Sequence, residues 1–116
     1  MDTICVLTAR GLQELKEQGG SQAWVLNANK ARKCQYVVCV QNELHDCERG
    51  SPSAPHHTAF VVGRLREVAR SPERDDRWIL LFSEYAEISI HNAWSGNRNP
   101  VSYTSLEELG IKVMVS

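Results

Sequence analysis

The chain has 116 residues, of which 42% are hydrophobic and 23% are charged, and its formal net charge is −1. This length and balance are typical of one folded domain with its own hydrophobic core and argue against a disordered chain. No apolar run reaches the ~18 residues of a membrane helix, and Asp2 stands where a signal peptide carries basic residues. We therefore predict a single domain spanning 1–116, a cytoplasmic location and no membrane partner.

The charges form two local groups. Lys30, Arg32 and Lys33 lie close together, whereas the arginines of the segment 64–77 alternate with acidic residues. Proteins that hold nucleic acid mainly by counterion release carry a marked basic excess, which this chain lacks. The sequence therefore argues against tight, non-specific binding of duplex nucleic acid, and the mixed segment is typical of a solvated surface.

The first third of the chain alternates between short apolar runs and helix-end signals. Thr8 is placed to cap a helix over 9–18 that Gly19 and Gly20 end, and Asn27 is placed to cap a short helix over 28–33. Apolar and β-branched runs predict strands at 4–7, 23–26 and 35–41.

The rest of the chain reads mainly as strands. After a long loop over 42–55 we expect strands at 58–68 (with a bulge or a tight barrel bend at Gly63), 78–82 and 86–90. A short helix opened by the Ser105–Glu108 capping box and a last strand within 111–115 follow. Five to seven short strands with two or three short helices predict an α+β fold built on a small curled β-barrel.

Four cysteines and four histidines raise the question of a metal. Their spacing does not match the Cys-x2–4-Cys pairs of common structural zinc sites, so we predict no metal and no cofactor. Cys5 and Cys39 lie in apolar runs and are expected to be small buried hydrophobic residues. His45, Cys47 and His56 are the ligands to examine if a metal is found.

The segment 91–100 is rich in groups that recognise flat polar ligands. It holds Trp94, Asn97, Arg98 and Asn99 within a stretch that also contains serine and glycine. An indole face can stack on a ligand ring, and amide and guanidinium groups can hydrogen-bond its edge. Turn formation is the competing interpretation of the Asn-Arg-Asn-Pro sequence.

Five segments together resemble a known superfamily: Trp24–Asn27, Tyr36–Val38, Ala59–Arg64, Trp78–Phe82 and Asn99–Leu109. In their order they look like the PUA-like barrels, especially the EVE, ASCH and YTH branches. The resemblance implies a pocket in the barrel wall that takes one unpaired or modified base of RNA or DNA. Stacking of such a base is worth about 1–3 kcal/mol.

On this interpretation the candidate binding residues are aromatic, amide, carboxylate and cationic side chains: Trp24, Asn27, Lys30, Arg32, Ser83, Glu84, Tyr85, Trp94, Asn97, Arg98 and Asn99. Each has a structural alternative. Trp24 also suits a hydrophobic core, Glu84 also suits an ion pair with an arginine, and Lys30 and Arg32 also suit a solvated helix face.

Two other functions stay open. Some ASCH-type proteins resemble amidohydrolases that act on modified nucleosides with a lysine, a threonine and a carboxylate, and Lys30, Glu84 and Thr104 supply those groups here. Alternatively, the barrel serves only as a scaffold for a protein partner, because a fold does not fix a function.

Overall fold

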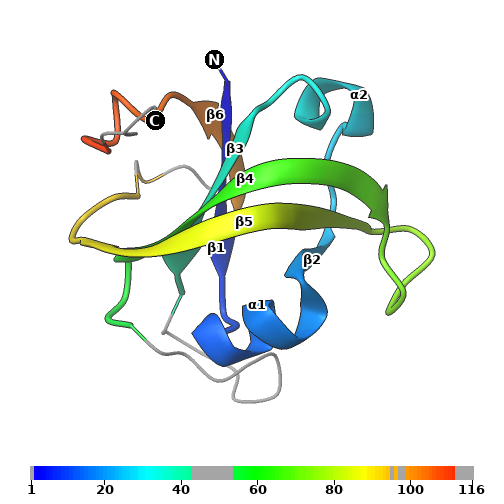
Figure 1. Ribbon diagram of the computed structural model, residues 1–116, viewed down its shortest axis with the longest axis horizontal. Coiled ribbons are helices and arrows are strands. Elements are labelled where there is room, and N and C mark those ends of the chain that lie inside the picture. The colour runs from blue at the N-terminus through cyan, green and yellow to red at the C-terminus, as the bar shows by residue number, and fades with distance from the viewer. Residues whose placement is uncertain (1, 43–53, 95, 97–98, 112–116) are drawn as a thin grey trace.

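The computed structural model describes residues 2–42, 54–94, 96 and 99–111. Figure 1 shows a small half-barrel in which two short helices accompany one curled sheet. Along the chain, the elements of the described ranges are β1 (Thr3–Thr8), α1 (Leu12–Gln18), β2 (Gly20–Trp24), α2 (Ala28–Ala31), β3 (Tyr36–Gln41), β4 (Ala59–Arg70), β5 (Trp78–Ile90) and β6 (Val101–Thr104). The expected α+β class and curled sheet are confirmed at this level.

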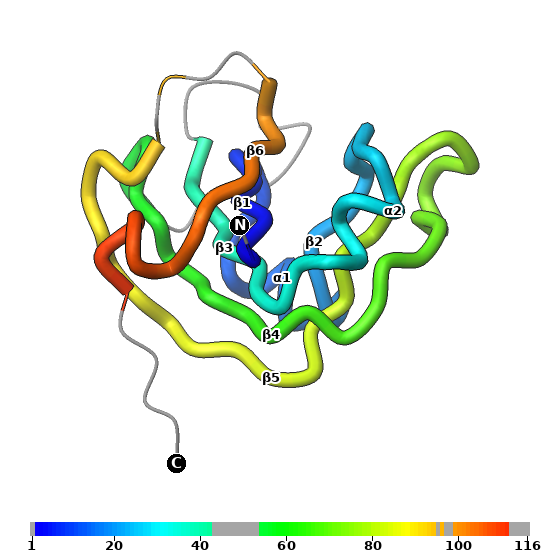
Figure 2. Tube along the Cα trace, turned by 90° about the horizontal axis from the view of Figure 1, so that it is seen from above, coloured from blue at the N-terminus to red at the C-terminus, as the bar shows by residue number. Residues whose placement is uncertain are grey.

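The strands follow the order β2-β5-β4-β3-β1-β6 across the sheet. β1 and β3 run parallel, and the other neighbouring pairs are antiparallel. The long strands β4 and β5 curve around the molecule in Figure 2, and α2 and β6 lie above their concave side. Within the described ranges, β2 and β6 are the two edges of this open sheet.

Hydrophobic clusters cover both faces of the sheet, because successive residues of a strand point to opposite sides. Ile4 and Val37 belong to the first cluster, which includes Leu15 of α1. Cys5 and Val38 belong to the second, which includes Trp94 and Leu106. Cys5 and Cys39 are 2% and 0% exposed, so their predicted burial is confirmed. In the described part of the chain, no helix has the length and apolar character to cross a membrane.

The first helix starts later than predicted. Thr8 is the last residue of β1, and its hydroxyl accepts a hydrogen bond from the Arg10 N–H (3.1 Å). α1 instead begins after Gly11, whose N–H donates to the Glu14 carboxylate (3.2 Å). Its predicted end is confirmed, since Gly19 adopts a left-handed conformation (φ 71°) after the last turn.

The second strand was placed too far along the chain. β2 ends at Trp24 and begins at Gly20, where an added Cβ would lie 2.1 Å from the Leu80 carbonyl oxygen. Only glycine allows the two backbones to approach this closely. The Asn27 cap of α2 is confirmed, because its side-chain oxygen accepts from the Lys30 N–H (3.2 Å), although α2 is shorter than the predicted helix.

Two predicted strands form one. We expected 83–85 to interrupt the sheet, but β5 runs unbroken for 13 residues. Phe82 pairs with Leu65 and Glu84 pairs with Arg64, so Ser83 is an extra residue in a β-bulge. The bulge accommodates the polar segment without ending the strand.

The end of the described chain also differs from the prediction. Val101–Thr104 forms a strand, β6, against β1, where none was expected. Ser105 accepts a hydrogen bond from the Glu108 N–H (3.2 Å), but the following residues form turns and not a helix. Ile111 lies outside any strand, and the rest of the expected last strand, 112–115, is outside the described residues.

Candidate functional site

Several of the predicted site residues line cavities, and these residues separate into two cavities on different parts of the sheet. One, which we call the β6 cavity, has a volume of about 520 Å³ and lies beside β6. Lys30, Trp94, Asn99 and Thr104 line it, and each of them was selected from the sequence. The volume falls in the range of small-ligand sites, about 300–1,000 Å³.

A lysine and a tyrosine form one side of the β6 cavity. The Asn27 cap fixes the start of α2, and Lys30 projects from this helix. The Lys30 Nζ lies 4.2 Å from the centre of the Tyr103 ring, within the range of a cation–π contact. Burial, followed by the nearby charge of Cys34, raises the pKa of the Tyr103 hydroxyl above its usual value of 10.0, so this phenol is neutral at pH 7.

A threonine and a carboxylate line another part of the β6 cavity. The Thr104 Oγ1 donates a hydrogen bond to the Glu108 Oε2 across 2.6 Å. The turn that follows β6 holds this pair, because the Ser105 hydroxyl accepts the Glu108 N–H. A similar side-chain-to-backbone hydrogen bond holds Asn99 at the start of β6, since its side-chain oxygen accepts from the Val101 N–H (3.1 Å). Amide, hydroxyl and carboxylate groups therefore meet in one cavity.

Two largely buried side chains complete the cavity. Burial raises the pKa of the Cys5 thiol to about 12, although a hydrogen bond with Ser102 lowers it slightly, so the thiol is neutral. Trp94 is only 9% exposed and packs in the second hydrophobic cluster with Leu106. Trp94 therefore belongs both to the core and to the wall of the cavity, and only a small part of its ring is exposed to the cavity.

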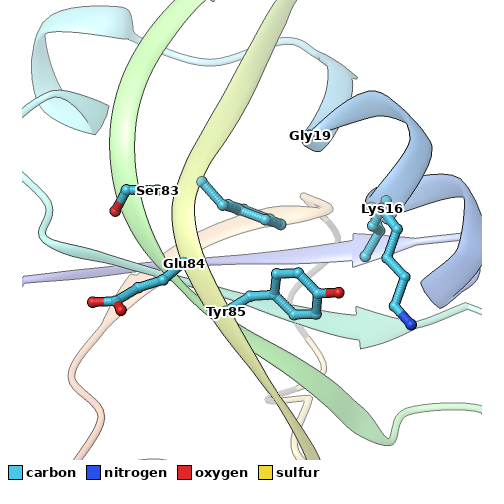
Figure 3. Close-up of a pocket in the computed structure, with 7 residues that line it drawn as sticks. Lys16, Gly19, Ser83, Glu84 and Tyr85 are labelled. Carbon is cyan, nitrogen blue, oxygen red and sulfur yellow. The ribbon is translucent and has the colours of Figure 1, made fainter.

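The second cavity, the α1 cavity, holds Ser83, Glu84 and Tyr85 of the predicted set and has a volume of about 480 Å³. Figure 3 shows Tyr85 pointing toward Lys16 of α1, whereas Ser83 and Glu84 point the other way. The Glu84 carboxylate pairs with the Arg64 Nε (3.1 Å) at the surface. The structural alternative for Glu84, an ion pair with an arginine, is therefore observed.

Three further predicted residues, Trp24, Asn27 and Arg32, are not part of the lining of either cavity. Trp24 is buried, and its indole N–H donates to the Ser21 hydroxyl (2.8 Å). Asn27 caps α2, and Arg32 lies over Trp78 with its guanidinium carbon 5.5 Å from the ring centre. Asn97 and Arg98 lie outside the described residues.

The three groups suggested for an amidohydrolase also separate. Lys30 and Thr104 line the β6 cavity, but Glu84 lies at the α1 cavity. Glu108, and not Glu84, is the carboxylate next to Thr104. As for metals, no group of three or more His, Cys, Asp or Glu side chains is placed to hold an ion in the ranges that the structure describes. His45 and Cys47 lie outside those ranges.

Sequence reasoning missed Tyr103 and Glu108. The Val101-Ser-Tyr-Thr run after Pro100 has the β-branched and aromatic composition of a strand, which was a usable signal for Tyr103. Glu108 was interpreted as the capping-box partner of Ser105, which accounts for its backbone but leaves its carboxylate free to meet Thr104.

Comparisons of the chain with protein-family models, with curated proteins and with solved structures found no match.

Proposed function

We propose that the β6 cavity binds a single unpaired or modified nucleobase presented by RNA or DNA, on a barrel of the PUA-like type. The observation that carries this proposal is the convergence of Lys30, Trp94, Asn99 and Thr104, which come from separate segments, on one cavity of 520 Å³. The volume is sufficient for a base and part of its sugar.

The chemistry of the cavity is compatible with this ligand. Tyr103 offers an aromatic face, and Thr104, Glu108 and Asn99 offer donors and acceptors for a base edge. Lys30 is exposed at the rim, so its ammonium group can move from the Tyr103 ring to a phosphate of the ligand. Base stacking on Tyr103 and phosphate binding by Lys30 then occur together.

Titration with mononucleotides tests the proposal. We would record backbone NMR spectra while adding the canonical nucleoside monophosphates and their methylated and acetylated forms. At least one is expected to shift the signals of Ser102, Tyr103 and Thr104. Lys30→Ala and Thr104→Val should each weaken that binding about tenfold or more, which corresponds to the loss of one charged or well-placed hydrogen bond.

Lys33→Ala is the matched control, because Lys33 is also an exposed lysine that follows α2 but does not line the cavity. Its affinity should equal that of the unmodified protein. The absence of any shift at β6 across the whole panel contradicts the proposal. Equal losses in Lys33→Ala and Lys30→Ala would also contradict it, because they would indicate general attraction by charge.

One observation favours a second function, hydrolysis of an acylated nucleoside. Thr104 and Glu108 share a hydrogen bond in the cavity that also holds Lys30, so a carboxylate is in place to accept the threonine proton. The Thr104 oxygen would attack the amide carbonyl, the amine would leave with the proton taken by Glu108, and water would hydrolyse the resulting ester of Thr104 to release the acid. Incubation with N4-acetylcytidine tests this, with Glu108→Gln expected to stop release of acetate. No release by the unmodified protein rejects this second function and leaves base binding unaffected.

A further inference from the structure

Two arginines from different elements lie against one tryptophan outside both cavities. Arg32 is the C-cap residue of α2, Arg70 ends β4, and Trp78 starts β5. The Arg70 guanidinium carbon lies 4.4 Å from the Trp78 ring centre, and the Arg32 carbon lies 5.5 Å from it. We call this group the Trp78 cluster (Arg32, Arg70 and Trp78).

Neutral oxygen atoms, and not carboxylates, accept the hydrogen bonds of both guanidinium groups. The Arg32 Nη2 donates to the Val68 carbonyl oxygen (3.3 Å), and the Arg70 Nη1 donates to the Asp75 carbonyl oxygen (2.8 Å). Within the described ranges, the arginines that do form ion pairs with acidic side chains are Arg10, Arg64, Arg74 and Arg77. Arg32 and Arg70 are therefore oriented but not neutralised.

This arrangement favours an anion. Two positive charges beside one ring repel each other, and an anion bound between them would offset the repulsion. Guanidinium groups bind phosphate oxygens through paired hydrogen bonds, and an indole ring adds a face for stacking. Phosphates and bases of nucleic acid combine both features.

The Trp78 cluster is connected to the β6 cavity through α2. Lys30 and Arg32 are two positions apart on a helix of about 3.6 residues per turn, so they leave it on roughly opposite sides. Lys30 reaches Tyr103 of β6, and Arg32 reaches Trp78 of β5. In Figure 2, α2 lies between β6 and the turn that joins β4 to β5. A helix with its side chains measures about 10–12 Å across, which a few nucleotides can span.

We infer that the Trp78 cluster is a second subsite, which binds the phosphates and a neighbouring base of a single-stranded nucleic acid that crosses α2. The inference rests on the proposed function, since the strand's first base occupies the β6 cavity. It specifies the ligand class as an oligonucleotide and not a free nucleoside. Single strands fit because their unpaired bases can stack on the guanidinium groups over Trp78 and on the exposed part of its ring, which a duplex does not allow.

Fluorescence anisotropy with labelled random-sequence 10-mers of RNA and DNA tests this subsite. Of the RNA and DNA 10-mers, we consider the one that the unmodified protein binds more tightly. The Arg32→Gln/Arg70→Gln double variant should bind this 10-mer at least tenfold more weakly than the unmodified protein. The slope of log affinity against log salt should decrease by about 0.7 for each lost phosphate contact, hence by about 1.4 in the double variant. A labelled duplex of the same length should bind more weakly than the single strand.

Arg66→Gln is the matched control, because Arg66 is an exposed arginine of β4 that is not part of the Trp78 cluster. Its affinity and salt slope should stay unchanged. Circular dichroism of each variant checks that it is folded. If Arg32→Gln/Arg70→Gln binds the 10-mers like the unmodified protein, or if Arg66→Gln weakens binding as much, the subsite is rejected.

The mononucleotide titration separates the two proposals. Mononucleotide binding at β6 together with unchanged 10-mer binding by the double variant rejects the subsite alone. Arginine-dependent binding of 10-mers without any mononucleotide shift at β6 supports the Trp78 cluster as a phosphate site and rejects the base pocket. If neither ligand binds, both proposals are rejected.

Discussion

Gly63 lies where β4 passes an aromatic ring of β5, and its replacement by alanine gives a sharp test of the packing. An added Cβ would lie 2.9 Å from Cδ1, 3.0 Å from Cγ and 3.3 Å from Cε1 of Phe82. Carbon atoms in favourable contact are separated by about 3.5–4.0 Å. The ring must therefore withdraw by roughly half an ångström or more.

The space around Phe82 decides the cost. Next to Leu12 and Val61 the free volume is only about 10 Å³, whereas the adjoining α1 cavity, which Phe82 also lines, offers about 480 Å³. Overpacking typically costs about 1–3 kcal/mol. Replacing glycine by alanine also reduces the conformational freedom of the unfolded chain, which stabilises the folded protein by about 0.4–1 kcal/mol. We expect Gly63→Ala to lower the free energy of unfolding by about 1.3 kcal/mol, the difference between the middle values of these two ranges.

Urea unfolding, followed by circular dichroism and tryptophan fluorescence, measures this change. The control is a double-mutant cycle with Phe82→Leu, whose smaller side chain relieves the contact. The double variant should be more stable than the sum of the single effects by about 0.5 kcal/mol or more. A Gly63→Ala protein as stable as the unmodified one, or an identical loss in the Phe82→Leu background, would refute the reasoning.

Three further predictions concern single positions. Ala23 has a left-handed backbone (φ 71°), so Ala23→Gly should raise the free energy of unfolding by up to about 1 kcal/mol in urea titrations. Asn27→Ala should lower it by about 0.5–2 kcal/mol, because the cap of α2 is lost. Burial raises the Cys5 pKa from 9.0 to about 12, so the unfolded thiol loses its proton first as the pH rises. Stability should fall by about 1.4 kcal/mol per pH unit between these values on account of this thiol, and Cys5→Ala should lack that part of the slope.

Each of these has a clear contrary result. A destabilised Ala23→Gly protein would show that the strain of the left-handed residue is smaller than the gain in unfolded-chain freedom. Asn29→Ala, at an exposed position within α2, is the control for the cap and should change stability less than Asn27→Ala. Identical alkaline slopes for Cys5→Ala and the unmodified protein would contradict the assigned effect of burial.

Local signals in the sequence were sufficient where one short segment determines the structure. The Asn27 cap was predicted because its side chain bonds to a backbone group only three residues away. The strands around Val38 and Val61 were predicted because β-branched residues favour extended backbone wherever they are placed. Lys30, Trp94, Asn99 and Thr104 were selected by residue type, and the structure brings these four to one cavity.

The features that local signals did not predict depend on the pairing of strands in the folded protein. Ser83 reads as an interruption in isolation, and only the register with Leu65 and Arg64 of β4 turns it into a bulge in a continuous strand. β6 has only four residues, and although their composition suits a strand, the strand forms by pairing with β1, which is distant in the sequence. The tertiary structure also places Thr104 at the cavity that Lys30 lines and leaves Glu84 at a separate cavity. Residue type determines which chemistry a side chain can perform, but distances between groups far apart in the chain depend on strand order and register, which no local pattern contains.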